Sequence, residues 1–280
     1  MNDDVEIRAA ALKWLCETNA THKADSVQVF GKKVASAKIE AELQHNECAY
    51  HVDNKNTLLF TQTVPGIPDK PELVSPRTLE KRSMKTLEGR VALVHALAHI
   101  EFNAINLALD AIWRFNEMPE AYYLDWLKVA AEEAYHFTLL NNHLISFGYQ
   151  YGDFAGHNSL WEMVDKTKEC VLARMALVPR TMEARGLDAN PQLRNKLAQA
   201  GDLDAAEILD IILRDEIGHV AVGNYWFNWL CEQDGLEPLA TFEQLRLQYA
   251  APKLRGPFNL EARRLAGFTE AELDRLIQIS

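Results

Sequence analysis

Two four-residue motifs, Glu133-Ala-Tyr-His136 and Glu216-Ile-Gly-His219, constrain the fold of this 280-residue chain more than any other feature. In each motif a carboxylate and an imidazole stand three positions apart, which puts them on one side of an α-helix. Carboxylates and imidazoles together bind divalent transition metals of the iron, manganese or zinc type. The two motifs therefore predict two helices that bring metal ligands to a shared interior.

Apolar residues at helical spacing, separated by turn residues, predict four long helices. The first helix stops before Pro119, and the second is closed by Gly148. The third ends at Gly186, and Asp202 can cap the start of the fourth. The predicted helices span about 86–116, 120–147, 158–185 and 203–232.

Shorter elements flank these helices. Residues 5–20 and 33–50 have the pattern of amphipathic helices, and the proline-containing stretch 52–78 predicts an extended strap. A short helical insert is predicted at 191–200, and a last helix near 269–278. The chain is thus predicted to be all-α, a four-helix bundle with extra N-terminal helices, a strap and a helical tail.

No good domain boundary is visible in the sequence. Residues 1–280 are therefore predicted to form a single domain, whose parts are a bundle core at about 86–232, an N-terminal extension at 1–85 and a C-terminal tail at 233–280.

Charge and hydropathy argue against two classes of partner. The net charge of −11 disfavours binding to nucleic acid or to an anionic membrane. The longest apolar stretch, 91–112, is interrupted by polar residues such as Glu101 and Asp110, which suits a buried helix better than a membrane span. The first twenty residues lack the apolar region of a secretory signal. We therefore expect partners other than nucleic acid or a membrane.

The cysteines fit a reduced cytoplasmic setting. They are widely scattered and form no Cys-x-x-Cys pair, which disfavours rubredoxin-type iron sites and structural zinc sites. The four residues are Cys16, Cys48, Cys170 and Cys231.

Burial identifies the carboxylates that are suited to bind metal. A ligand must face the interior, so its helical neighbours at three, four and seven positions should be apolar. Glu133 and Glu216 meet this condition, and Glu101 meets it on the first helix. An unpaired charge in such a stripe would cost several kcal/mol or take up a proton, and metal coordination removes that cost.

The third helix offers three acids, Glu162, Glu169 and Glu183. Glu162 and Glu169 share a stripe of charged residues that is typical of a solvated face. Glu183 follows apolar residues on its face and is the preferred ligand, although it stands three residues before the predicted helix end. Pro179 is also expected to kink the helix there. Glu162 and Glu169 stay open as alternatives.

The spacing of the acids supports the same set. Glu101 and Glu133 are 32 residues apart, and Glu183 and Glu216 are 33 apart, with a predicted turn near each midpoint. Antiparallel helices joined at those turns would hold each carboxylate pair at one depth. Four-helix proteins with two metals use two Glu-x-x-His helices and one lone Glu from each of the other two. The predicted ligands are Glu101, Glu133, His136, Glu183, Glu216 and His219.

His95 and His99 stand one helical turn apart near Glu101. Helix geometry turns Glu101 about 200° away from His99. We interpret both histidines as hydrogen-bonded core residues or supports for the ligands rather than as ligands.

Three residues beside the motifs could support the ligands. Asp215 and Glu132 each precede a ligand glutamate and could orient an imidazole. An ordinary exposed acid is an equally good interpretation of Glu132. Tyr135 lies inside the first motif and could approach the metals, although a structural role is the favoured interpretation.

A longer sequence context surrounds the motifs: HALAHIEFNAINLALDAIWRF, DWLKVAAEEAYHFTLL, YGDFAGHNSLWEM, RMALVPRTMEARGLD and ILRDEIGHVAVGNYWF. It resembles a bacterial ferritin-like family classified as a domain of unknown function (DUF455-like), and the resemblance extends through PELVSPR and GPFNLEARRLAGF. More distantly, the paired motifs resemble ferritin, rubrerythrin, the diiron hydroxylases and a tRNA-modifying hydroxylase. This resemblance implies two iron ions, held by the six residues above, that react with dioxygen or peroxide. The residues alone equally allow manganese.

The leading functional hypothesis is a diiron oxidoreductase that oxidises or hydroxylates an unknown small or medium organic substrate. No Gly-x-Gly-x-x-Gly motif follows a strand, so a separate reductase would supply electrons. A homodimer is compatible with the sequence. Two alternatives remain: a ferroxidase or iron-handling protein, and a scaffold in which metal only neutralises buried acids. A tRNA hydroxylase is disfavoured because the chain is acidic and has no basic stripe.

Overall fold

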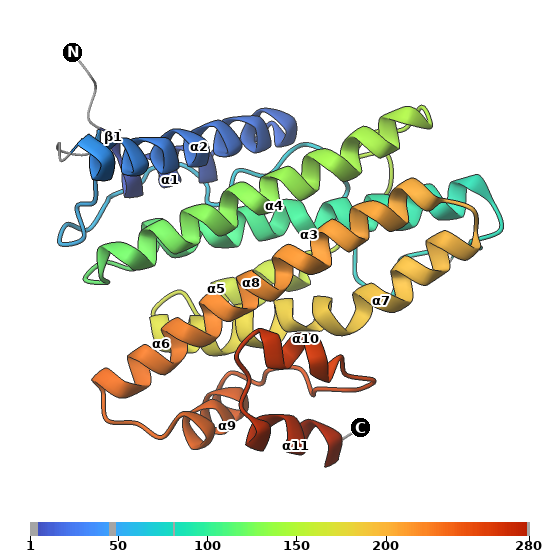
Figure 1. Cartoon of the computed structure of the whole chain (residues 1–280). Coiled ribbons are helices and arrows are strands. Elements are labelled where there is room, and N and C mark those ends of the chain that lie inside the picture. Colours follow the sequence, from blue (N-terminus) through green and yellow to red (C-terminus); the bar gives the residue numbers. More distant parts are fainter. Residues whose placement is uncertain (1–4, 45–48, 81, 279–280) are drawn as a thin grey trace. The chain divides into compact units, whose positions relative to one another are not determined.

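The computed structural model describes residues 5–44, 49–80 and 82–278, and helices dominate it (Figure 1). The prediction of an all-α protein is confirmed. Two short strands, β1 (Val5–Glu6) and β2 (Tyr50–His51), pair in parallel. The chain divides into two compact units, Met1–Lys81 with Val91–His157, and Arg82–Arg90 with Asn158–Ser280. The single-domain prediction concerns how the two units are joined, and it stays a prediction.

The first N-terminal helix is shorter than the predicted 5–20. Helix α1 (Ile7–Leu15) begins where the Glu6 carboxylate accepts hydrogen bonds from the backbone N–H groups of Arg8 and Ala9. The chain leaves the helix at Cys16, and Gly66 of the strap donates its N–H to the Leu15 carbonyl at 2.8 Å. This bond satisfies a carbonyl at the helix end.

The second helix was predicted at 33–50, and the predicted start was wrong. Helix α2 runs over Ala20–Gln44, because the Asn19 side chain caps it by accepting from the His22 N–H at 2.9 Å. Gly31 lies inside this helix, where an added Cβ would come within 2.6 Å of the Ala131 Cβ on α4. The glycine permits close packing of α2 along α4 (Figure 1) and does not end the helix. Residues 45–48 of the prediction lie outside the described part of the chain.

The predicted strap is confirmed as extended chain. Residues 52–80 contain no helix, and they are hydrogen bonded to the same unit at several points. Glu117 donates its N–H to the Asn54 carbonyl at 2.6 Å, and Leu73 bridges to Gly156. The strap therefore ties the α3–α4 turn to the start of the chain.

Helices α3 (Leu87–Arg114) and α4 (Glu120–Ser146) agree with the predicted 86–116 and 120–147 within two residues. They pack antiparallel. Near the turn the Tyr123 hydroxyl donates to the Phe115 carbonyl at 3.0 Å, and deeper in the pair the Phe102 and Phe137 rings lie 5.8 Å apart. The turn thus places residues of α3 opposite residues of α4 at matched depth.

One helix of the structure, α3, bears on the prediction that the chain does not span a membrane. Among the described residues α3 is the one helix long and apolar enough to cross a membrane, and 78% of its most apolar window is buried. Such burial is typical of the core helix of a soluble protein.

Cys16, Cys170 and Cys231 are free thiols, and Cys48 lies outside the described residues.

The predicted third helix, 158–185, is broken once: α5 (Ser159–Lys166) is separate, and α6 (Val171–Leu177) continues directly into a π-helix, η1 (Val178–Glu183). The break arises because Arg174 donates to the Val164 carbonyl at 2.7 Å and to the Thr167 hydroxyl at 2.9 Å. A buried guanidinium thus takes the backbone carbonyl that a continuous helix would have used.

The π-helix η1 has Pro179 as its second residue, where the sequence predicted a kink. Proline has no N–H, so the Met175 carbonyl loses its usual partner four residues on. The Thr181 hydroxyl donates to the neighbouring Ala176 carbonyl at 2.8 Å. These changes favour the wider π turn. This form is rare in proteins overall, but where it occurs it is often at a functional site.

The predicted helix end at Gly186 and the separate insert at 191–200 were both wrong. Helix α7 runs continuously over Ala184–Gln199, through Gly186 and Pro191. The proline leaves the Leu187 carbonyl without its helical donor, and the Asn259 amide from the tail donates to it at 3.2 Å. The helix therefore continues because a distant side chain replaces the lost hydrogen bond.

Helix α8 (Leu203–Gln233) confirms the predicted 203–232, and the Asp202 side chain caps it by accepting from the Ala205 N–H at 3.1 Å. It packs antiparallel to η1 and α7. Asn190 donates to the Leu209 carbonyl at 3.0 Å near one end, and Gly223 meets Pro179 near the other.

The tail folds back onto this pair of helices. It consists of α9 (Pro238–Gln248), α10 (Leu260–Leu265) and α11 (Glu270–Gln278), and α11 lies within one residue of the predicted 269–278. Its apolar side chains form one cluster with residues of α7 and α8. The buried members are Ala184, Leu187, Val220, Ala262, Ala266, Phe268, Leu273 and Leu276.

Candidate metal centre

The first unit brings three candidate ligands together. Helix α3 supplies Glu101, and α4 supplies Glu133 and His136. The His136 Nδ1 atom lies 3.3 Å from an oxygen of Glu101 and 3.5 Å from an oxygen of Glu133. One ligand atom from each residue lies within 4.8 Å of the others, and all three side chains are buried. The antiparallel helix pair therefore creates a buried group with the donor atoms of a metal site.

Electrostatics favour a cation at this point. Burial raises the pKa of Glu101 well above its usual value, the nearby Glu133 carboxylate raises it further, and the hydrogen bond from His136 opposes the shift. Two carboxylates cannot both ionise cheaply in an apolar interior. A divalent cation would remove this repulsion, and the oxygen and nitrogen donors suit iron, manganese or zinc. This buried Glu/His group could hold a metal ion.

The second unit carries the matching residues. Glu216 and His219 lie on one side of α8, with the His219 Nδ1 atom 3.7 Å from a Glu216 oxygen. Glu183 is the last residue of η1. All three side chains are buried. The antiparallel contacts on either side of Glu183 place it level with Glu216.

The position of Glu183 differs from the expectation in one respect. It lies inside a continuous helical run from Val171 to Gln199 and not near a helix end. Glu162 and Glu169, the two alternatives, are exposed. Of the three acids only Glu183 lies in the core.

The three residues beside the motifs have ordinary contacts. Glu132 is half-buried and forms an ion pair with Lys128 at 3.7 Å. Asp215 is half-buried and accepts from the exposed Arg214 at 2.8 Å. Tyr135 is 40% exposed, with its ring 6.4 Å from that of His136.

His95 and His99 are hydrogen bonded to the loop that follows α4. The His99 Nε2 donates to the His157 carbonyl at 3.0 Å, and its Nδ1 accepts from the Tyr151 hydroxyl at 2.8 Å. Gly152 donates its N–H to the His95 Nε2 at 2.8 Å. Burial lowers the pKa of His95 to about 4, so this ring stays neutral and can accept that bond at neutral pH.

The sequence did not identify Tyr151 and Gly156 as supports for this part of the unit. An added Cβ at Gly156 would lie 2.7 Å from the His99 Nε2, so only glycine fits beneath the ring. The loop 149–157 is rich in glycine and aromatic residues, and this composition was the available signal. Spacing along the helix could not show which loop residue the histidines would meet.

Comparison with known proteins shows the family to which the chain belongs. A family described as "Protein of unknown function (DUF455)" matches residues 13–274. An uncharacterized protein of Haemophilus influenzae is 51% identical over 232 residues, which cover 79% of this chain and 81% of that protein. No solved structure matches. All six candidate ligands lie inside the range that the family covers.

Proposed function

We propose that this chain, which belongs to the DUF455 family of proteins of unknown function, is a ferritin-like dimetal oxidoreductase. It would activate dioxygen or peroxide and oxidise or hydroxylate an organic substrate. One observation carries the proposal: each unit holds a lone buried glutamate and a buried Glu-x-x-His motif on antiparallel helices. Such a repeated donor set is what two-metal bundles require.

The proposed centre combines both halves. Helices α3, α4 and α8, with the run from α6 to α7, would form a four-helix bundle around two metal ions. Bound iron would supply electrons to dioxygen in pairs, and manganese would satisfy the same donors. The ligands proposed for the two ions are Glu101, Glu133, His136, Glu183, Glu216 and His219.

The chain's own residues would have three tasks. The carboxylates balance the charge of the ions, and burial keeps bulk water away from the reacting groups. Burial and Glu133 raise the pKa of Glu101, so the carboxylate pair favours taking up a proton when no cation is present. Metal binding would displace that proton.

The remaining parts of the proposal follow from this reaction. The substrate is a small or medium organic molecule, and electrons come from a separate reductase. The protein would act in the cytoplasm, where thiols such as Cys16, Cys170 and Cys231 stay reduced. A homodimer is compatible with this role.

Anaerobic loading with ferrous ion tests the proposal. The full-length protein should bind two iron ions per chain, and exposure to oxygen should oxidise them in a reaction that stops at that stoichiometry. Glu101→Ala should impair the reaction, whereas Glu162→Ala, an exposed acid, should leave it unchanged. Oxidation that continues far beyond two ions per chain would support iron handling instead. Iron that stays ferrous in air for hours would indicate that the bound metal has only a structural role.

A further inference from the structure

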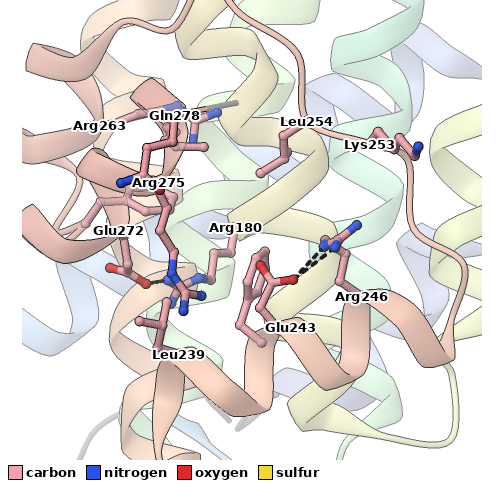
Figure 2. A pocket seen from close by; sticks show the side chains of 13 residues that line it. Arg180, Leu239, Glu243, Arg246, Lys253, Leu254, Arg263, Glu272, Arg275 and Gln278 are labelled. Carbon is pink, nitrogen blue, oxygen red and sulfur yellow. Dashed lines mark hydrogen bonds and ion pairs between the residues drawn. The ribbon is translucent and has the colours of Figure 1, made fainter. Parts of the chain in front are cut away.

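The C-terminal unit contains a cavity of about 520 Å³ whose lining includes none of the six candidate ligands (Figure 2). Its walls come from η1, α9, α10, α11 and the segment between α9 and α10. Cavities of this size hold small organic ligands. The cavity is therefore large enough to be a binding site of its own.

The lining is basic although the chain as a whole carries a net charge of −11. Five cationic side chains face two carboxylates, Glu243 and Glu272. The cationic residues are Arg180, Arg246, Lys253, Arg263 and Arg275. This local excess of positive charge favours an anionic ligand.

Several of these charges are already paired. Arg180 pairs with Glu272, and Arg246 donates to Glu243 at 2.9 Å (Figure 2). Arg263 pairs with Asp188, which does not line the cavity, at 2.7 Å.

Lys253 and Arg275 have no ion pair within 4 Å among the described residues, so their charges are available at the rim. Arg275 acts on the exposed carboxyl of Glu237 from a distance and contributes weakly to lowering its pKa. An anion could approach either cation without displacing an existing ion pair.

Arg180 adds a buried positive charge beside the cavity. Its guanidinium is buried over the rings of Phe242 and Phe268, with its central carbon 5.0 and 5.2 Å from the ring centroids. The Nε atom is buried and has no hydrogen-bond partner in the described part of the chain, so Arg180 contributes positive charge near the cavity and not an accessible donor. Burial lowers the pKa of Arg180 to about 10, so the group stays charged at neutral pH.

The rest of the lining is apolar. Leu239, Phe242, Leu254, Phe268 and Leu276 provide a surface beside the cations. We propose that this cavity binds a small organic oxyanion, a carboxylate or a phosphate monoester attached to an apolar body. The oxyanion is attracted by the positive charge of the lining, above all by the rim cations Lys253 and Arg275, and the apolar body packs against the leucine and phenylalanine side chains.

Calorimetric titration of the full-length protein tests this site. Octanoate and octyl phosphate are the anionic ligands, and octanol and octylamine have the same chain without negative charge. At least one anion should bind at least tenfold more tightly than octanol or octylamine. Whichever anion binds more tightly identifies the preferred headgroup. The titration needs no metal, so its failure is distinct from failure of the proposed oxidoreductase.

The double variant Lys253→Gln/Arg275→Gln removes the two rim cations, which are exposed, so the variant is expected to fold as the wild type does. It should weaken anion binding roughly tenfold and leave octanol binding unchanged. The matched control, Lys196→Gln/Arg255→Gln, changes the charge equally at exposed positions of the same unit outside the lining.

Three results would overturn the proposal. Absence of binding by both anions up to about 1 mM would leave the ion pairs a structural role only. Octanol binding as tightly as the anions would show an apolar cavity without anion selectivity. Equal losses in the rim variant and the control would show that total charge, and not this cavity, attracts the anion.

Discussion

The Nδ1 atom of His136 on α4 lies 3.3 Å from a carboxylate oxygen of Glu101 on α3. Both side chains are buried, and Glu133 brings a second acid to the same point. Burial and that second acid keep the pKa of Glu101 high. Two buried carboxylates side by side repel each other when both are ionised, and a bound cation would remove this repulsion.

Metal removal should therefore destabilise the protein. A metal that binds only the native state adds about 2.7 kcal/mol when its free concentration is one hundred times its Kd. Chelation should lower the melting temperature by roughly 5–10 °C. Thermal unfolding followed by circular dichroism, with ferrous or manganous ion and with chelator, measures this difference.

His136→Ala and His219→Ala should each reduce the response to metal, because each removes one nitrogen donor. His51→Ala is the matched control, since His51 is exposed and far from both motifs in sequence. The prediction fails if wild-type protein melts at the same temperature with and without metal.

The third-helix ligand can be tested by stoichiometry. Glu183→Gln keeps the size of the side chain but removes its charge, so it should weaken binding of at least one ion by about 10- to 100-fold. Glu162→Gln and Glu169→Gln alter exposed acids and should bind metal as the wild type does. Metal analysis after dialysis against a buffered metal concentration separates the three. Loss of metal in either exposed variant, with Glu183→Gln unaffected, would reassign the ligand.

The long helices could be predicted because their signals are local. An apolar stripe, a capping aspartate at Asp202 and a turn at Pro119 all act within a few residues of the helix they define. The buried acids of α3, α4 and α8, which are the candidate ligands, could be selected for the same reason, since a carboxylate stands out in an apolar stripe.

The errors came from contacts between distant residues. The second helix was predicted to begin at residue 33, but Gly31 lies inside α2 and allows it to approach Ala131. A helix end was predicted at Gly186 and a separate insert at 191–200, but α7 continues, and Asn259 from the tail replaces the hydrogen bond lost at Pro191. Local sequence contains neither partner, so its pattern predicted chain breaks where the fold has continuous helices.

The π-helix was predicted only in part. The sequence indicated a distortion at Pro179, but its form depends on the facing helix. An added Cβ at Gly223 of α8 would lie 2.5 Å from the Pro179 Cβ, so η1 packs directly against the α8 backbone.

Gly223→Ala should therefore destabilise the protein. Alanine favours a helix by up to about 1 kcal/mol over glycine. Here the new methyl meets a rigid proline ring, and overpacking typically costs about 1–3 kcal/mol. Because the displaced segment carries Glu183, metal affinity should also fall. Chemical denaturation and metal titration measure the two effects.

Gly218→Ala is the matched control in the same helix. An added Cβ there meets nothing within 4 Å, so only the gain in helix propensity remains. This variant should be more stable than the wild type by up to about 1 kcal/mol. If both variants were stabilised equally, the close contact at Pro179 would be without energetic consequence.

Lys23 on α2 is a buried cation that the sequence did not single out. Its ammonium donates to the Asn106 side-chain oxygen at 2.5 Å and to the carbonyls of Leu15 and Gly66 at 3.2 Å each. Burial lowers its pKa from 10.5 to about 7. The group thus joins α2, the strap and α3 at the cost of a desolvated charge.

This shift makes stability depend on pH in a defined direction. Between pH 7 and pH 10.5 the folded Lys23 is mostly neutral while the unfolded one is protonated. The unfolded state binds more protons in that window, so stability rises with pH. Below pH 7 both states are protonated and the penalty is constant. Lys23→Met cannot titrate, so it lacks this contribution.

The measurement compares the two proteins by chemical denaturation at several pH values. The free energy of unfolding of the wild type minus that of Lys23→Met should increase from pH 7 to pH 10, by at most about 1.4 kcal/mol per pH unit. Taking the difference cancels the titration of other groups, which both proteins share. A difference that stays constant across this range would mean that the three oxygen acceptors keep Lys23 charged despite its burial.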